Sequence, residues 1–176
     1  GYHLHFKDMV MMQEYLLHRS IKEHVELIKK KPTDLATHTS LANAYTALAK
    51  LYSMPKDLPF KDNGMLARRF EKESMRTRFM NATQRAIEEL KILDDLAPND
   101  SWVHAQLASC YYHLEMFEEE IVEYEILLNI RPSDKEILYR LGLLYFRLGK
   151  NAKGLTIYES LKEIDAKDAA HLITHY

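Results

Sequence analysis

One aspartate and two histidines late in the sequence have the spacing of a metal site. Asp168, His171 and His175 follow one another at three- and four-residue steps, so on a helix their side chains share one face. Such a face can ligate a divalent metal ion. No cysteine accompanies them and they lie at an end that frays readily, so we expect neither a metal nor a cofactor.

The sequence contains none of the patterns typical of catalysis. We find no glycine-rich phosphate loop, no nucleophile elbow and no paired histidine and cysteine. The single cysteine, Cys110, excludes an internal disulfide and is expected to be buried as a small hydrophobic side chain. One cysteine also favours a reducing compartment. We therefore predict a cytoplasmic protein that is not an enzyme.

A basic segment follows Met65, with only Glu71 and Glu73 to offset its charge. Its basic residues are Arg68, Arg69, Lys72, Arg76, Arg78 and Arg85. A basic amphipathic helix can bind RNA, an acidic protein or anionic lipid. The alternative is a solvated helix face with local ion pairs, such as Arg68 with Glu71. The formal net charge of −2 and the scarcity of nearby aromatic residues favour the solvated face, and we do not expect nucleic-acid binding.

The composition allows one sizeable core or the continuous core of a short stack, because 47% of the 176 residues are hydrophobic. No run of 18 apolar residues occurs, which predicts no membrane span. The sequence also shows no initiating methionine and no signal peptide. We interpret it as a piece of a longer protein.

The elements that position these residues follow from a repeat of 34 residues. Each copy has a leucine, a small residue, a tyrosine three positions later and then apolar residues at helical steps, which predicts two amphipathic helices. The residues are Leu107, Ala108, Tyr111, Phe117, Ile121, Tyr124, Leu127 and Ile130 in the first copy, and Leu141, Gly142, Tyr145, Leu155, Tyr158, Leu161 and Ile164 in the second. Turns are expected at Glu115-Met116 and Gly149-Lys150.

This pattern resembles the tetratricopeptide repeat, a helix-turn-helix of about 34 residues. Two positions of the motif depart from the family in both copies. The usual alanine early in the second helix is Glu120 in one copy and Gly154 in the other, and the usual tryptophan of the first helix is His104 and Leu138. Glu120 is expected to loosen the packing or to shift the register. An earlier copy begins at Pro32 and closes at Pro98, a span of 66 residues, so it carries about 32 inserted residues.

The resemblance implies an all-α, right-handed superhelical stack of such hairpins in a single domain, with a long inserted helix and a C-terminal capping helix. The predicted parts are a partial repeat at 8–32, a repeat at 33–98 with an insertion at about 53–84, repeats at 99–132 and 133–166, and a capping helix at 167–176. The insertion is predicted to begin with a loop, Ser53 to Gly64. Its helix, from Met65, is expected to project from the stack or to fold over one end.

Helix starts are predicted at three Pro-X-Asp sequences, which begin at Pro32, Pro98 and Pro132. Each ends one helix and offers a polar N-cap for the next. Ala166-Lys167-Asp168 is a weaker fourth.

The resemblance also implies a concave groove lined by the first helix of each repeat. The predicted groove residues are Asn43, Trp102, Gln106, Ser109, Tyr112, His113, Tyr139, Arg140, Leu143, Phe146 and Arg147, with Thr39 and Thr46 beside Asn43. Tryptophan, tyrosine and arginine dominate binding energy at interfaces. The alternative is that Trp102 and Tyr112 pack against the insertion or neighbouring helices. The convex side is expected to expose an acidic cluster: Glu115, Glu118, Glu119, Glu120, Glu123 and Glu125.

Some family members bind the C-terminal carboxylate of chaperones through lysines, asparagines and an arginine. The matching positions here hold Thr39, Asn43, Gln106, Glu136 and Arg140. Both lysines are absent, so we do not expect that clamp.

The predicted function is protein–protein interaction, as an adaptor, scaffold or co-chaperone that binds a partner peptide or helix in the groove. The alternative is a structural or self-assembly domain of a larger protein, including a homodimer, that uses the inserted basic helix. Nucleic-acid binding through that helix is a lesser alternative, and a chaperone-like secretion protein is a minor variant.

Overall fold

The computed structural model describes the backbone of residues 2–53 and 65–176, and the side chains of residues 8–53 and 72–176. The predicted loop that follows Ser53 therefore lies outside the described residues. The side chains of Arg68 and Arg69 lie outside the described side chains. The described chain is all helical, as predicted. Its helices are α1 (Tyr2–Lys30), α2 (Leu35–Ser53), α3 (Met65–Leu96), α4 (Ser101–His113), α5 (Phe117–Ile130), α6 (Lys135–Arg147), α7 (Asn151–Ile164), α8 (Ala166–Leu172) and the 3₁₀ turn η1 (Ile173–His175).

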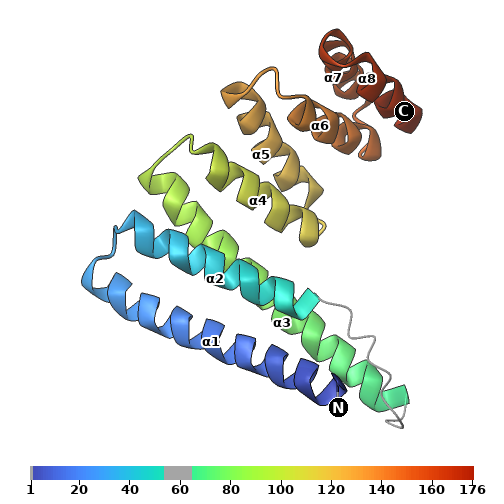
Figure 1. Cartoon of the computed structure of the whole chain (residues 1–176). Helices are drawn as coiled ribbons and strands as arrows, with labels where there is room; N and C mark the ends of the chain where they lie inside the picture. The colour runs from blue at the N-terminus through green and yellow to red at the C-terminus, as the bar shows by residue number, and fades with distance from the viewer. Residues whose placement is uncertain (1, 54–64) are drawn as a thin grey trace. The chain divides into compact units, whose positions relative to one another are not determined.

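The chain divides into two compact units, Gly1–Leu96 and Ala97–Tyr176. In the first unit α2 packs against both α1 and α3 (Figure 1). Its core contains Leu48, Ala49, Tyr52 and Ala82, with Leu17, Ile21, Met75 and Phe79 packed against them. From residue 72 onward α3 therefore packs beside α1 and α2. The expectation that this part projects or folds over an end is wrong, because the long α1 and α2 cover its apolar side.

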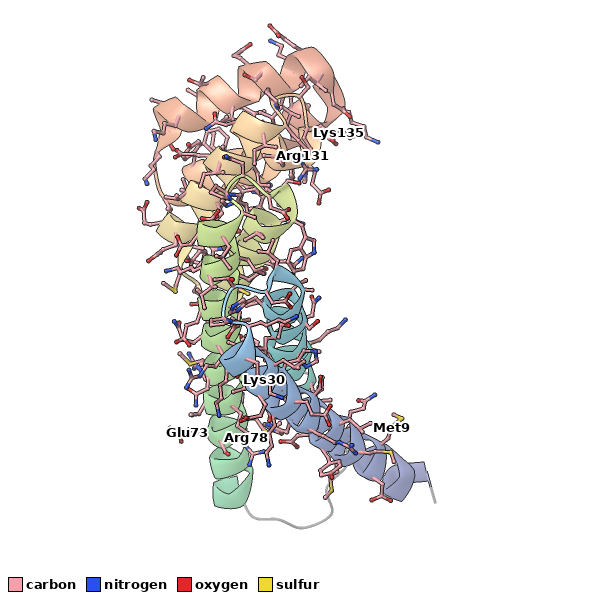
Figure 2. All side chains as sticks on the ribbon, turned by 90° about the vertical axis from the view of Figure 1, so that its left-hand side faces the viewer. Met9, Lys30, Glu73, Arg78, Arg131 and Lys135 are labelled. Carbon is pink, nitrogen blue, oxygen red and sulfur yellow. The ribbon has the colours of Figure 1, made fainter. Side chains whose placement is uncertain are left out.

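Polar contacts also join the three helices of the first unit. Glu14 Oε1 accepts hydrogen bonds from the Tyr52 hydroxyl at 2.8 Å and from Arg78 Nη1 at 3.2 Å. Arg78 lies on the side of α3 that faces α1 (Figure 2). Burial, followed by the hydrogen bond to Glu14, raises the pKa of Tyr52 to about 12. Arg78 is thus part of the packing of this unit.

The second unit contains the hairpins α4–α5 and α6–α7, with α8 packed on α6 and α7. Leu138, Leu141, Leu161 and Leu172 are almost completely buried in its core. Leu172 lies against Gly142, where an added Cβ would come 2.6 Å from the leucine side chain. The small residue predicted on the first helix of this repeat therefore lets α8 pack closely.

Aspartates cap the helices at each predicted start. Asp34 Oδ2 accepts from Thr37 N at 2.9 Å, Asp100 Oδ1 from Trp102 N at 2.8 Å, and Asp134 Oδ1 from Glu136 N at 3.1 Å. The fourth cap is Asp165, which accepts from the backbone N–H groups of Lys167 and Asp168. It replaces the predicted Ala166-Lys167-Asp168 start because Asp165 directly precedes the helix.

Each unit contains a buried histidine that contacts a glutamate, which is partly buried in the first unit and buried in the second. His38 Nδ1 lies 2.6 Å from Glu89 Oε2, and His104 Nδ1 lies 2.7 Å from Glu123 Oε2. The partners are 51 residues apart in the first pair and 19 in the second. The difference of 32 equals the length of the predicted insertion, so the pairs occupy equivalent positions of two hairpins. The third hairpin has Leu138 and Ile157 at these positions, both in the core.

The acidic cluster is not wholly on the surface. Glu120 is 4% exposed and Glu123 is 9% exposed. The expectation of an exposed convex cluster is therefore wrong for these two residues, because the periodicity of α5 turns them toward its neighbours. α5 begins at Phe117, directly after the predicted turn at Glu115-Met116, so its start shows no shift of register.

Candidate partner-binding faces

One face of α4 carries five of the predicted groove residues. Trp102 and Gln106 are half-buried, whereas Ser109, Tyr112 and His113 are exposed. Tyr112 is 51% exposed, and its ring meets that of His113 edge to face at 5.4 Å between centroids. α4 is held in place by its Asp100 cap and by the His104–Glu123 pair on its other side. It therefore presents a polar and aromatic face without losing its packing.

The aromatic residue that begins the α6 face, Tyr139, is partly covered by α8. Its ring stacks on that of His171 at 5.8 Å with an interplanar angle of 4°. The Tyr139 hydroxyl lies 2.5 Å from His171 Nδ1. Tyr139 therefore helps to hold the capping helix, and only part of its surface is free.

Phe146 differs from the sequence-based expectation, which placed it on the groove. It is 6% exposed, and its ring contacts that of Tyr176 edge to face at 5.7 Å. The reason is Gly154, where an added Cβ would come 2.6 Å from Phe146 Cδ1. The glycine that replaces the family's usual alanine thus leaves space for the ring. Phe146 belongs to the core and offers no open surface to a partner.

Two exposed arginines of α6, Arg140 and Arg147, lie on one face because seven residues make two helical turns. Arg147 Cζ lies 3.9 Å from the centroid of the Phe117 ring, which is a cation–π contact between α6 and α5. Within residues 97–176, neither arginine has a carboxylate at ion-pair distance. Other cations of this unit do, as in Arg131 with Asp134 at 3.0 Å and Lys153 with Glu125 at 3.2 Å.

Glu120 lies beside these arginines and was not predicted as a site residue. Among the described side chains, its Oε2 is the buried oxygen that has no hydrogen-bond partner. Burial raises the pKa of Glu120, and the positive charges of Arg140 and Arg147 oppose that shift in part. The signal available in the sequence was the acid at a position where the family has alanine. From the sequence alone, this replacement indicated a packing defect. In the structure, Glu120 is instead a buried carboxylate beside two guanidinium groups.

The first unit carries the last predicted groove residue, Asn43, which is exposed on α2. The hydroxyls of its neighbours Thr39 and Thr46 donate to backbone carbonyls of their own helix, at 2.8 Å in both cases. Asn43 is thus the freer polar group of this face. A groove that runs from α2 to α6 stays a prediction.

Comparison with known proteins identifies the fold. No protein-family model and no curated protein matches the sequence. Among solved structures, TTC0263, a thermophilic TPR protein of Thermus thermophilus, is 20% identical with a TM-score of 0.52, covering 91% of this chain and 71% of that chain. The structure of MamA is 15% identical with a TM-score of 0.55, covering 88% of this chain and 83% of that chain. The chain has a tetratricopeptide-like fold.

The basic segment of this tetratricopeptide-like chain is partly neutralised where its side chains are described. Arg78 pairs with Glu14 at 3.2 Å, and Arg85 pairs with Glu88 at 3.0 Å. Lys72 and Arg76 are exposed. The Arg85–Glu88 pair is local and is of the kind expected for a solvated helix face, whereas the Arg78–Glu14 pair joins α3 to α1.

The remaining candidate chemistry has structural roles. His171 contacts Tyr139, and Asp168 pairs with Lys135 at 3.4 Å. No group of three potential ligands that could hold a metal occurs among the described residues. Cys110 is buried, as predicted, and burial raises the pKa of its thiol to about 11. Of the helices described, none has the length and apolar character needed to cross a membrane.

Proposed function

We propose that the chain is a protein–protein interaction module, an adaptor, scaffold or co-chaperone without enzymatic activity, that binds a partner peptide or helix on the exposed faces of α4 and α6. The observation that carries the proposal is Tyr112, which is 51% exposed on α4 next to His113. Large amphipathic side chains of this kind contribute strongly to interfaces at low entropic cost. A cytoplasmic location, inferred from the single cysteine, is part of the same proposal.

The test is selection of binding peptides from a random display library by the purified chain, followed by affinity measurements on one selected peptide. We expect Tyr112→Ala to weaken the affinity about tenfold or more, because truncation of a central aromatic residue typically costs about 2 kcal/mol or more and about 1.4 kcal/mol is a factor of ten. Val122→Ala is the matched control, since Val122 is 50% exposed but lies on α5. Equal affinity of wild type and Tyr112→Ala, with unchanged helical content, would reject this face as the binding surface.

A second candidate is self-assembly, which a different observation favours. The described start of α1 exposes apolar side chains, among them Met12 at 65%, Tyr15 at 65% and Leu16 at 52%. Exposed apolar patches often mark interaction sites. If these apolar side chains join two copies of the chain, sedimentation velocity will show a dimer. The double variant Met12→Glu with Leu16→Glu should then be a monomer. A monomeric wild-type chain at high concentration removes this candidate.

A further inference from the structure

The partner's chemistry can be inferred from the contact region of α5 and α6. It consists of Phe117 and Glu120 on α5 with Arg140 and Arg147 on α6, and we call it the arginine face. Resting on the proposed function, we propose that the arginine face binds an acidic segment of a partner protein, and that Glu120 takes up a proton when the segment binds.

The positive charges of the arginine face have no ion-pair partner in their own unit. Arg140 and Arg147 are exposed, and no carboxylate of residues 97–176 lies within ion-pair distance of either one. Lys135 and Lys150 in the same unit are paired with Asp165 and Glu118, respectively. Guanidinium groups form strong, bidentate hydrogen bonds with carboxylates. The two arginines are therefore free to receive acidic side chains from outside.

One arginine of this face is held in position. The Arg147 guanidinium stacks on Phe117 at 3.9 Å, which limits its motion and leaves the N–H groups at its edge available. A positioned donor loses less conformational entropy on binding than a free side chain. The contact of Arg147 with Phe117 therefore favours binding of a carboxylate at Arg147 over simple screening of its charge by salt ions.

Glu120 is 4% exposed and has a carboxylate oxygen without a hydrogen bond. A carboxylate in this environment keeps its charge at a cost, which the two arginines reduce. An acidic ligand bound to the arginines offsets their positive charge, so they stabilise the charged form of Glu120 less. The charged form of Glu120 then becomes less favourable, so binding and protonation of Glu120 are thermodynamically linked.

Other titratable groups surround Glu120. Tyr124 of α5 faces it, and burial together with the charge of Glu120 raises the pKa of Tyr124. Glu136 of α6 acts on Tyr124 as well. From α4, His104 is occupied by Glu123, Tyr111 is buried and His113 is exposed. Glu120 is thus the acid of this region that combines burial with an unbonded oxygen.

The spacing of the arginines indicates the spacing of the acids. A seven-residue separation on a helix corresponds to about 10 Å along its axis, from a rise of about 1.5 Å per residue. An extended segment covers about 10 Å in three residues. The expected partner therefore carries acidic residues three positions apart if it is extended, or seven apart if it is helical.

The test starts from the same random display library. Peptides selected by the wild-type chain are expected to be enriched in aspartate and glutamate at these spacings. Arg140→Ala with Arg147→Ala should weaken a selected peptide by about tenfold or more, as for loss of charge-assisted hydrogen bonds. Arg131→Ala with Lys162→Ala is the matched control, because it removes the same charge from the same unit.

Proton uptake is measured with the same peptide by titration calorimetry in buffers of different ionisation enthalpy. The measurement is made near pH 6, which lies about 1.5 units above the ordinary pKa of a glutamate side chain. When the peptide binds, we expect wild type to take up protons from solution and Glu120→Gln to take up none. Glu120→Gln should also bind more tightly than wild type at neutral pH, since it resembles the protonated acid.

The outcomes separate the two proposals. Peptides that bind but lack acidic enrichment, or that tolerate the double arginine variant, would overturn the acidic partner and leave the proposed function standing. Zero proton uptake by wild type would overturn the role of Glu120. Failure to select any peptide would count against the proposed function itself.

Discussion

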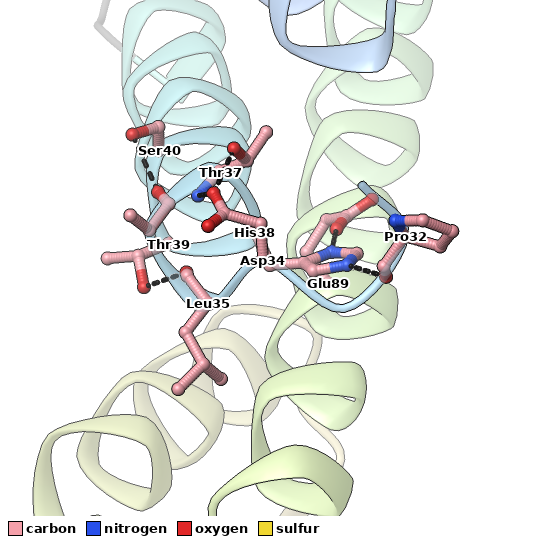
Figure 3. A network of polar contacts seen from close by, with 9 residues as sticks. Pro32, Asp34, Leu35, Thr37, His38, Thr39, Ser40 and Glu89 are labelled. Atoms are coloured by element: carbon pink, nitrogen blue, oxygen red, sulfur yellow. Dashed lines mark hydrogen bonds and ion pairs between the residues drawn. The ribbon is translucent and has the colours of Figure 1, made fainter. Parts of the chain in front are cut away.

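At the residue scale, His38 makes the stability of the first unit depend on pH. Its Nδ1 lies 2.6 Å from Glu89 and its Nε2 lies 2.9 Å from the Pro32 carbonyl oxygen (Figure 3). Both partners are acceptors, so both bonds form only when the ring is protonated. Burial alone lowers the pKa of His38, but the hydrogen bonds to Pro32 and Glu89 outweigh it and the pKa is raised above 6.5.

The sign of the pH effect follows from that shift. The stabilisation is present in full below about pH 6.5 and is lost as the pH rises through the folded-state pKa. We expect His38→Gln to lower the free energy of unfolding by about 1–3 kcal/mol near pH 6 and by less near pH 8. Urea unfolding at both pH values measures the difference. His113→Gln, at an exposed histidine, serves as control, and a loss that is larger at pH 8 would contradict the assignment.

Glu115 adopts a backbone conformation that favours glycine. Its φ is 57°, and the equivalent turn residue one repeat later is Gly149, with φ 69°. The left-handed region costs a non-glycine residue about 1–2 kcal/mol, and glycine loses about 0.5–1 kcal/mol in extra chain entropy. We therefore expect Glu115→Gly to stabilise the chain by about 0.5–1 kcal/mol in denaturant unfolding. Gly149→Ala should destabilise it, and the opposite pair of signs would refute this explanation.

Residue types at helix starts and in the core were predictable, whereas burial of charge was not. The Pro-X-Asp sequences predicted the helix starts, since an aspartate at such a position has a backbone amide to accept from. Burial of Glu120 and of the His104–Glu123 pair depends on which neighbours face α5. Those neighbours are distant in sequence, so the sequence alone placed all the acids of this cluster on the exposed side.

At the scale of elements, Gly154 decides where the Phe146 side chain lies. An alanine there would overlap the phenylalanine ring, and overpacking of this kind costs about 1–3 kcal/mol. Alanine has a higher helix propensity than glycine, which offsets this cost by about 1 kcal/mol. Gly154→Ala is therefore expected to lower the free energy of unfolding by up to about 2 kcal/mol, measured by thermal or urea unfolding.

Two further variants separate the clash from the propensity. Thr156→Ala changes an exposed position of α7 without adding a clash, and it should be neutral or stabilising. Phe146→Leu combined with Gly154→Ala should cost less than the sum of the single changes, because the smaller side chain vacates the overlap. Strict additivity would show that the glycine does not act through Phe146.

The order and length of the elements could be predicted because the 34-residue period is a local property of the sequence. The long helix α3 was likewise expected from an uninterrupted run of helix-forming residues. Its packing against α1 and α2 was not expected, because Phe79 and Ala82 of the insertion join a cluster with Leu48 and Ala49, which are distant from them in the sequence. Periodicity predicts which residues share a face, and it does not specify which element covers that face.

At the scale of the whole molecule, each unit has a core of its own, around Leu48 and Ala49 in the first and around Leu138 and Leu161 in the second. In helical repeat proteins, stability is approximately a sum of local terms and contacts between neighbouring repeats. The units therefore need not share one stability. The composition allowed one sizeable core or the continuous core of a short stack, because composition does not report how contacts are partitioned along the chain.

The single tryptophan gives the chain an optical reporter for one half of its structure. Trp102 lies on α4 in the unit Ala97–Tyr176, and the first unit has no tryptophan. Tryptophan fluorescence therefore follows the second unit alone, whereas far-ultraviolet circular dichroism follows the helices of both. We expect the two signals to give different unfolding midpoints in urea, and coincident curves would instead indicate one cooperative transition. Because Trp102 shares a helix with Tyr112, the same emission can also follow occupation of α4 by a peptide without any added label.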